Sequence, residues 1–297
     1  MRANKGFYFL IGTFLAVTAC ETSLDFELHM VPKLTIISHL SADINTDQKV
    51  YVYASQSPTD SSHFYTPDDL VVDVTEVDSD ITIRLDTTFA DGKMHFKFPV
   101  GFLKAGFTYS ITAFAPGFDI VQATTIIPKP STITDLSIKD MLIEQSEVHE
   151  FKKIIRYKLV FNIDHFEGNR YYHLVFYNQY KGLDNYYLVD PQPSDHQPFI
   201  QHYDYGVLLD KEDLTEGEPL TFEFKDWAVD NNNLIKVFVE LRTITEGYYK
   251  YHSSLARQLN IRQDPFAEPV SIFNNIDGGY GNFSGFSPAT SFFDLPE

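Results

Sequence analysis

The chain has 297 residues, of which 43% are hydrophobic and 15% aromatic, and its formal net charge is −18 at pH 7. This composition is typical of a folded protein and excludes a disordered chain, because it supplies enough apolar surface for a core. The excess of acidic residues argues against nucleic-acid binding, since phosphate groups would repel the chain. The length suggests about two domains.

The first nineteen residues have the pattern of a secretory signal peptide. Arg2 and Lys5 provide positive charge, residues 7–17 are almost wholly apolar, and small residues follow. The apolar run is too short to cross a bilayer as a helix, which takes about 20 residues, but it suits the hydrophobic region of a signal peptide. We therefore assign residues 1–19 to a signal peptide and expect no transmembrane helix.

Cys20 is the only cysteine of the chain. Val17-Thr18-Ala19-Cys20 resembles a bacterial lipobox, in which the cysteine becomes the first mature residue and is acylated, for example with palmitate. Acylation would remove a reactive free thiol, and several acyl chains would anchor the protein stably to a membrane. The alternative is a chance cysteine beside an ordinary cleavage site. We expect lipidation of Cys20, which leaves no cysteine for a disulfide.

Residues 20–31 are predicted to form a tether, and its first charges are acidic. Glu21, Asp25 and Glu27 precede the first basic residue, Lys33. This arrangement resembles the export signal of Bacteroidota lipoproteins, which directs them to the outer face of the outer membrane. A solvated acidic tether is the alternative. The prediction is an outer-membrane lipoprotein exposed at the cell surface.

Residues 32–128 are predicted to form an immunoglobulin-like or fibronectin-like β-sandwich. Short runs rich in β-branched and aromatic residues follow one another between turns: KLTIISHL, KVYVYAS, LVVDVTEV, DITIRLD, KMHFKF, FTYSITAF and DIVQATTII. Several alternate with period two, such as Val50, Val52 and Ala54 against the residues between them, as in half-buried strands. Tyr109 is expected to be a buried corner tyrosine whose hydroxyl bonds nearby backbone.

Pro128 and Pro130 mark the predicted domain boundary, because proline fixes φ and cannot donate to a strand ladder. Residues 131–297 should form a second, mostly-β domain. Within it, 154–163 and 170–178 are predicted to be a strand pair, 181–205 a long polar loop, and 245–260 a short helix with Tyr248, His252, Leu255 and Leu259 on one face. The predicted class of the whole chain is mainly β.

The segment DPFAEPVSIFNNIDGGYGNFSGFSP, residues 264–288, is the most distinctive stretch. Its glycines permit positive φ or close backbone approach, so we predict a structural turn that closes the second sheet, with Ile276, Tyr280 and Phe283 packed inward. A phosphate-binding loop would need a helix after the glycines, and none is predicted. The residues assigned to this structural motif, besides Tyr109, are Pro265, Phe266, Glu268, Pro269, Asn275, Gly278, Gly279, Gly281 and Phe283.

This segment resembles the C-terminal hallmark of a Bacteroidota lipoprotein family, catalogued as domain of unknown function 4249. The lipobox, the strand at Gly106–Tyr109 and Ile126-Ile127-Pro128 also match. Members look like surface lipoproteins encoded near TonB-dependent outer-membrane receptors. The resemblance therefore implies a receptor-accessory role and implies no ligand.

Aromatic residues crowd the region 171–205, where about half should be buried and the rest could form a contact surface, as interfaces favour aromatics. Sugars also stack on such faces. The predicted binding residues are Tyr180, Tyr186, Tyr187, His196, Phe199, His202, Tyr203 and Asp204.

No catalytic motif is present. Ser253 and Ser254 beside His252 do not form a triad, since neighbouring helix positions do not face each other. No close histidine spacing predicts a metal site, and we expect no metal, no other cofactor and no catalytic residue. Asp86-Thr87-Thr88 resembles an O-glycosylation sequon at Thr87.

These observations lead to a non-enzymatic outer-membrane lipoprotein that binds a β-barrel receptor of the TonB-dependent class or an extracellular ligand. A cell-envelope assembly or adhesion module is an alternative. A glycan or peptide hydrolase that uses acidic residues is another, since the chain is rich in acids whose spacing in the fold the sequence does not give.

Overall fold

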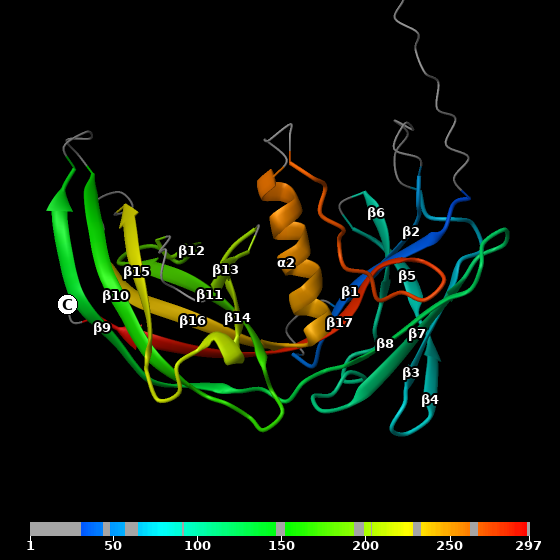
Figure 1. Ribbon diagram of the computed structural model, residues 1–297, viewed down its shortest axis with the longest axis horizontal. Coiled ribbons are helices and arrows are strands. Elements are labelled where there is room, and N and C mark those ends of the chain that lie inside the picture. The colour runs from blue at the N-terminus through cyan, green and yellow to red at the C-terminus, as the bar shows by residue number, and fades with distance from the viewer. Residues whose placement is uncertain are drawn as a thin grey trace, which may run out of the picture.

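The structure is a computed structural model, which describes residues 31–43, 48–56, 65–90, 92–146, 152–192, 199–202, 204–227, 233–261 and 267–295. The predicted signal peptide and Cys20 lie outside the described residues, as do almost all of the predicted tether and His196, Tyr203, Pro265 and Phe266. The described residues are mainly β and include one α-helix, α2, which confirms the predicted fold class (Figure 1). None of the helices in these ranges has the length and apolarity needed to cross a membrane.

The N-terminal half contains two facing β-layers. Its strands are β1 (Leu34–Ser41), β2 (Lys49–Ala54), β3 (Val71–Glu76), β4 (Ile81–Arg84), β5 (Asp86–Ala90), β6 (Lys93–Lys97), β7 (Thr108–Phe114) and β8 (Val121–Ile126). One layer has the order β1-β2-β6-β5 and the other β4-β3-β7-β8. All seven predicted strands are present, and β5, which carries Thr87, is an additional one. Whether this half is immunoglobulin-like stays a prediction.

Tyr109 on β7 is fully buried between these layers. Its hydroxyl oxygen accepts a hydrogen bond from the Lys104 backbone N–H at 2.8 Å and donates one to the Phe102 carbonyl oxygen at 3.2 Å. Burial raises the pKa of Tyr109 to about 12, although the Lys104 N–H favours the phenolate. The side chain therefore ties the loop before β7 to the core.

The C-terminal half is built from long strands and α2. The elements are β9 (Thr132–Gln145), β10 (Lys153–Asp164), β11 (Tyr171–Tyr180), β12 (Tyr186–Leu188), β13 (Phe199–Gln201), β14 (Val207–Asp210), the 3₁₀ turn η1 (Lys211–Asp213), β15 (Leu220–Trp227), β16 (Leu234–Ile244), α2 (Glu246–Ile261) and β17 (Tyr280–Asp294). One layer has the order β15-β10-β9 and the other β13-β14-β11-β16-β17, with β12 paired to β11. Phe176 packs between Phe222 and Phe224 of the opposite layer, with ring centres 5.1 and 5.0 Å apart.

The predicted strand pair of 154–163 with 170–178 is wrong. Both segments are strands, but β10 pairs with β9 and β15, whereas β11 pairs with β12, β14 and β16. The physical reason is that both strands carry large apolar side chains that must be buried, and they bury them against each other across the core. The predicted loop 181–205 also contains two short strands, β12 and β13.

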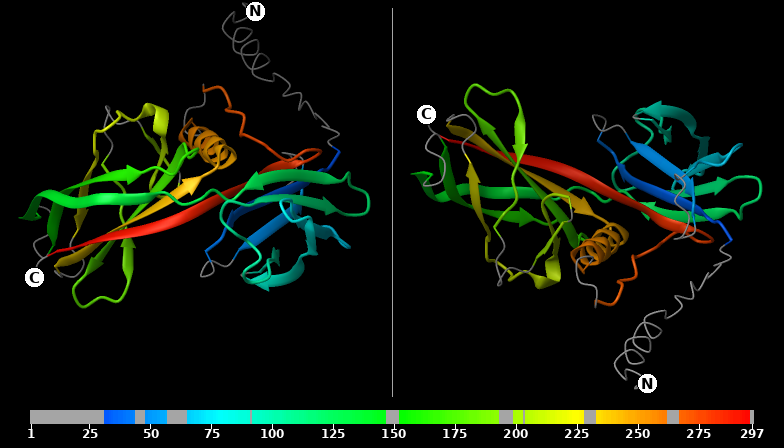
Figure 2. Two further views of the ribbon diagram at one scale, coloured as in Figure 1. Left: turned by 90° about the horizontal axis from the view of Figure 1, so that it is seen from below. Right: turned by 90° about the horizontal axis from the view of Figure 1, so that it is seen from above.

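Strand β17 joins the two halves into one ten-stranded sheet (Figure 2). Residues 280–286 pair in parallel with β1, and residues 286–294 pair antiparallel with β16. Gly281 has a φ of +112°, and a Cβ atom there would collide with the carbonyl oxygen of Ile36. The close approach of β17 to β1 therefore requires glycine at this position.

The glycine-rich motif closes the N-terminal core, not the second sheet as predicted. Ile276 and Phe283 are buried in the same cluster as Leu34, while Tyr280 is 41% exposed. Asn275 holds the turn, because its side chain donates to the Phe283 carbonyl oxygen and accepts from the Phe283 N–H, at 2.8 and 2.9 Å. The reason for the difference is that β17 begins beside β1. Of the other predicted motif residues, Gly279 is buried and Gly278, Glu268 and Pro269 are exposed.

The helix predicted over 245–260 is confirmed as α2, but its buried face differs from the prediction. Tyr248, His252, Ser253 and Ala256 are buried, whereas Leu255 is half-buried and Leu259 is 39% exposed. The helix lies between the two halves (Figure 1) and packs the side chains of Tyr248 and His252 on the sheet. Its buried residues end at Ala256, so its last turn does not pack in the core.

Candidate ligand-binding face

The structure places Tyr180 in the core, which corrects its predicted role as a binding residue. Its side chain is fully buried, and its hydroxyl donates to Asp226 Oδ2 at 2.5 Å. Burial and Asp226 both raise the pKa of Tyr180. A side chain enclosed in this way stabilises the fold and has no surface to offer a partner.

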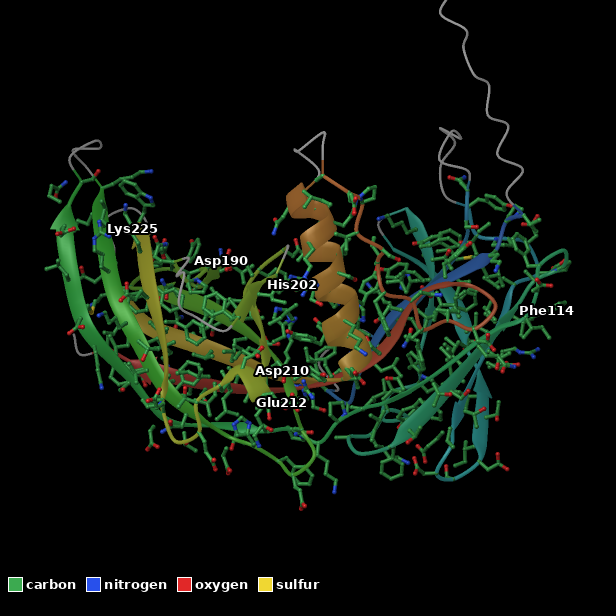
Figure 3. All side chains as sticks on the ribbon, viewed as in Figure 1. Phe114, Asp190, His202, Asp210, Glu212 and Lys225 are labelled. Atoms are coloured by element: carbon green, nitrogen blue, oxygen red, sulfur yellow. The ribbon has the colours of Figure 1, made fainter. Side chains whose placement is uncertain are left out.

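The other predicted binding residues that the structure describes fall into three places. Tyr186 on β12 is 58% exposed. Tyr187 and Phe199 are half-buried and pack against the second core cluster. His202 is buried beside α2, whereas Asp204, two residues later, is exposed (Figure 3). The fold therefore does not gather these residues into one surface.

His202 belongs to a group of four histidines, hereafter the histidine cluster: the half-buried His39 of β1 and the buried His173 of β11, His202 after β13, and His252 of α2. The His202 ring centre lies 4.6 Å from that of His173 and 4.8 Å from that of His252. His39 lies 4.8 Å from His252, ring centre to ring centre. Segments from β1, β11, the end of β13 and α2 therefore meet where α2 packs on the sheet.

Hydrogen bonds fix the orientation of these rings. Nε2 of His202 and Nδ1 of His252 are 2.9 Å apart, so one of the two carries the proton that they share. His173 contacts the Tyr248 hydroxyl through Nδ1 at 3.1 Å and the Tyr205 carbonyl oxygen through Nε2 at 3.0 Å. The cluster thereby attaches α2 to strands from both halves of the molecule.

The electrostatics of the histidine cluster favour neutral imidazoles. Burial lowers the pKa of His39 and of His202 to about 4, with Arg242 adding to the effect, and burial also lowers the pKa values of His173 and His252 well below the ordinary histidine value. Within the described ranges no group of three or more histidine, cysteine, aspartate or glutamate side chains is arranged to hold a metal ion. Neutral imidazole rings in mutual contact suit a structural role, in which the cluster holds α2 on the sheet.

Beside the histidine cluster lies a more open surface, the Arg242 face, which we define as the side chains of Tyr177, Phe238, Glu240, Arg242 and Phe292. Phe238, Glu240 and Arg242 alternate along β16 with the buried Val237, Val239 and Leu241. Residues of a strand at i, i+2 and i+4 share one side of the sheet. Tyr177 of β11 and Phe292 of β17 stand opposite Phe238 in register.

An ion pair forms the polar end of the Arg242 face. Arg242 Nε donates to Glu240 Oε1 at 2.6 Å, and their side chains are only 15% and 20% exposed. Tyr177 donates its hydroxyl to the other Glu240 oxygen at 3.3 Å. Burial opposes the charge on Arg242, but Glu240, Tyr248 and Tyr205 together outweigh it and raise the Arg242 pKa. Burial and Glu240 also raise the pKa of Tyr177 to about 12.

Two aromatic rings contact the guanidinium of Arg242. Its central carbon lies 5.7 Å from the Tyr205 ring centre and 5.5 Å from that of Phe286, distances typical of cation–π contacts. Among the described residues, the hydrogen bond of the Arg242 guanidinium to Glu240 is donated by Nε and not by an Nη atom. The guanidinium is thus fixed in place while its Nη atoms keep hydrogen-bonding capacity.

A cleft of about 550 Å³ opens at this ion pair, beyond the end of β1, where β17 remains paired with β16. Its lining consists of Ala42, Asp43, Ala105, Pro130, Glu240, Arg242, Phe286, Ser287, Pro288 and Thr290. A volume of this size falls within the range of small-molecule sites, which combine apolar walls with a few placed polar groups.

Aromatic side chains form the other end of the Arg242 face. Phe292 is 54% exposed, and its ring centre lies 5.8 Å from that of Phe238. Tyr186 stands edge-on to Phe238 at 4.8 Å. Lys236 holds its ammonium 4.2 Å from the Phe292 ring centre and 2.9 Å from an Asp294 oxygen. The aromatic side chains of Phe238, Phe292 and Tyr186 therefore extend the Arg242 face beyond the polar cleft.

The family model described as "Domain of unknown function (DUF4249)" matches residues 21–291. The chain belongs to this family. The match confirms the resemblance predicted from the C-terminal motif, and it takes in every strand of the DUF4249 domain described above apart from the last residues of β17. A comparison with curated proteins finds no match.

Sequence reasoning missed the Arg242 face of the DUF4249 domain. The segment LIKVFVELRTI alternates apolar residues with Lys236, Phe238, Glu240 and Arg242, and this alternation would have placed all four on one side of a strand. Nothing in the sequence indicated that β17 would bring Phe292 opposite Phe238, because the pairing partners of a strand cannot be deduced from its own pattern.

Proposed function

We propose that this DUF4249 protein is a surface lipoprotein of the outer membrane, anchored through acylated Cys20, which serves a TonB-dependent receptor system as a non-enzymatic ligand-binding accessory. The observation that carries the proposal is the single cysteine at the end of Val17-Thr18-Ala19-Cys20, directly after an apolar run and directly before the family domain. Attachment to the membrane would raise the local concentration of the protein near its partner.

Two further observations support the proposal. The tether begins with acidic residues, which anionic lipid headgroups would repel, so the folded domain would project away from the bilayer. The aromatic-rich Arg242 face, which lines a cleft and exposes Phe292, has the composition of a recognition surface. Both are expected of a protein that captures a ligand outside the cell.

The anchor is tested by metabolic labelling with an alkyne analogue of palmitate. We expect label and membrane association in the wild type, and neither in Cys20→Ser. Ser23→Ala, which changes a neighbouring residue but leaves the lipobox intact, is the matched control and should be labelled normally. An unlabelled wild type, or a Cys20→Ser variant labelled as strongly as the wild type, would reject the anchor.

The location and the partner need separate measurements. Proteinase K added to intact cells should digest the wild-type protein, and affinity purification from detergent-solubilised outer membranes should enrich a TonB-dependent β-barrel receptor over a Cys20→Ser preparation. Protection from the protease would contradict surface exposure. Failure to enrich any β-barrel protein would contradict the receptor association.

A further inference from the structure

We propose that the Arg242 face binds a neutral saccharide chain, with the Glu240–Arg242 pair in contact with sugar hydroxyls and Phe238 and Phe292 in contact with sugar-ring carbons. The inference rests on the proposed function, since it names the class of ligand that the surface domain would capture.

The first step of the argument is the hydrogen-bonding capacity of the ion pair. The Nη atoms of Arg242 are donors, and the Glu240 carboxylate retains lone pairs beyond those used by Arg242 and Tyr177. Neighbouring sugar hydroxyls each carry a donor and acceptors. Two adjacent hydroxyls can therefore donate to Glu240 and accept from Arg242 at the same time, and both bonds would be charge-assisted.

The second step is that the pair is fixed before a ligand arrives. The rings of Tyr205 and Phe286 contact the guanidinium, and the Tyr177 hydroxyl donates to the carboxylate. Both charged side chains are mostly buried. Preorganised side chains lose little conformational freedom on binding, so their hydrogen bonds contribute more to affinity.

The third step is charge. An anionic ligand would meet Glu240 and Asp43 in the cleft and Asp294 beside Phe292, on a chain with an excess of acidic residues. A cationic ligand would meet Arg242 and Lys236. A neutral polyhydroxylated ligand meets no net repulsion at either end of the face.

The fourth step is the extent of the face. From Phe238 to Arg242 the strand advances four residues, or about 13 Å. Polar groups lie at one end of this stretch and aromatic rings at the other, because Thr290 stands opposite Glu240 and Phe292 stands opposite Phe238. This length suits more than one sugar ring, which favours a chain over a monosaccharide.

The test is isothermal titration calorimetry on the full lipidated chain, solubilised in lauryldimethylamine N-oxide because sugar-based detergents would compete. The probes are maltohexaose, cellohexaose, xylohexaose and mannohexaose, with oligogalacturonate as the anionic comparison. We expect at least one neutral hexasaccharide to bind and oligogalacturonate to bind at least tenfold more weakly.

Variants locate the binding. Arg242→Lys keeps the charge but removes the planar Nη donors, and Glu240→Gln keeps the shape but removes the charged acceptor; each should weaken binding at least tenfold. Phe292→Ala should weaken it several-fold. Phe89→Ala removes a ring that is 73% exposed on β5 of the other half and should leave affinity unchanged. Circular dichroism melting checks that each variant is folded, and Phe292→Ala, at an exposed position, keeps the test decisive if an ion-pair variant unfolds.

Three results would overturn the inference: no neutral probe binding at millimolar concentration, preference for oligogalacturonate, or affinity unaffected by Phe292→Ala and by the folded ion-pair variants. None of these would touch the lipid anchor or the receptor association, which are measured by labelling and purification. The failure of the saccharide inference is therefore distinguishable from the failure of the proposed function.

Discussion

Nε2 of His202 lies 2.9 Å from Nδ1 of His252, which joins the segment after β13 to the middle of α2. The contact is buried, and it places two imidazoles where protonating both would bring two like charges together. This relationship makes the attachment of α2 to the sheet sensitive to pH.

The first prediction concerns that sensitivity. The pKa values of His39 and His202 are lowered to about 4 in the folded chain, whereas an unfolded histidine titrates near 6.5. Below about pH 6.5 the unfolded state therefore binds protons that the folded state does not, and stability falls as pH falls. Each such histidine contributes a slope of up to about 1.4 kcal/mol per pH unit between the two pKa values.

Thermal unfolding at pH 7.5, 6.5 and 5.5 measures the effect. We expect little change between the first two values and a clear fall of Tm at the third. His202→Gln removes one of the titrating groups, so its Tm should depend less on pH. An unchanged wild-type Tm at pH 5.5 would show that protonation of the histidine cluster does not destabilise the folded state, and it would contradict the prediction.

The second prediction separates a core tyrosine from an exposed one. Tyr180→Phe removes the donor to Asp226 and leaves that carboxylate without its short hydrogen bond, which should lower the free energy of unfolding by about 1–3 kcal/mol. Tyr186→Phe, at a side chain that is 58% exposed, is the control and should be nearly neutral. Urea denaturation measures both. Equal effects of the two substitutions would contradict the structural role given to Tyr180.

The third prediction concerns the junction of β17 with β1. Ala at Gly281 would adopt a disfavoured positive φ and would also collide with the Ile36 carbonyl oxygen. Gly101 likewise has a positive φ, +77°, but open space around its Cβ position. Gly101→Ala should therefore show the conformational cost alone, about 1–2 kcal/mol.

Gly281→Ala should be destabilised well beyond Gly101→Ala, to the point of poor soluble yield. Urea denaturation of both variants, with their soluble yields, gives the comparison. Similar stability of the two variants would mean that β17 can move away from β1 at little cost.

The fourth prediction concerns the boundary between the halves. The Ser131 backbone N–H, just after Pro130, donates to Thr243 Oγ1 of β16 at 2.9 Å in a buried position. Thr243→Val keeps the shape but leaves that N–H unsatisfied, so we expect a loss of about 1–3 kcal/mol in urea denaturation. Thr132→Val, at an exposed neighbouring position, should have almost no effect. A neutral Thr243→Val would show that this hydrogen bond does not stabilise the boundary.

Local patterns in the sequence predicted α2, most strands of the N-terminal half and several strands of the C-terminal half. Alternation marked β2 and β7, and the spacing of Tyr248 and His252 marked α2, because these periodicities reflect the geometry of a single element. β5 was missed, since its residues, DTTFA, carry no clear alternation. Lipidation of Cys20 is likewise a prediction from local sequence, as it depends on a few adjacent residues.

The sequence by itself determined the mainly-β class, the helix and the family, because each depends on short stretches of the chain. Only the tertiary structure decided that β17 pairs with β1, that Tyr180 is buried, and that three histidines of the sheet and its loops meet His252 of α2. His39 and Ser284, which are hydrogen-bonded at 2.7 Å, are separated by 245 positions. Contacts at such separations depend on how whole layers pack, and the packing arises from all strands together.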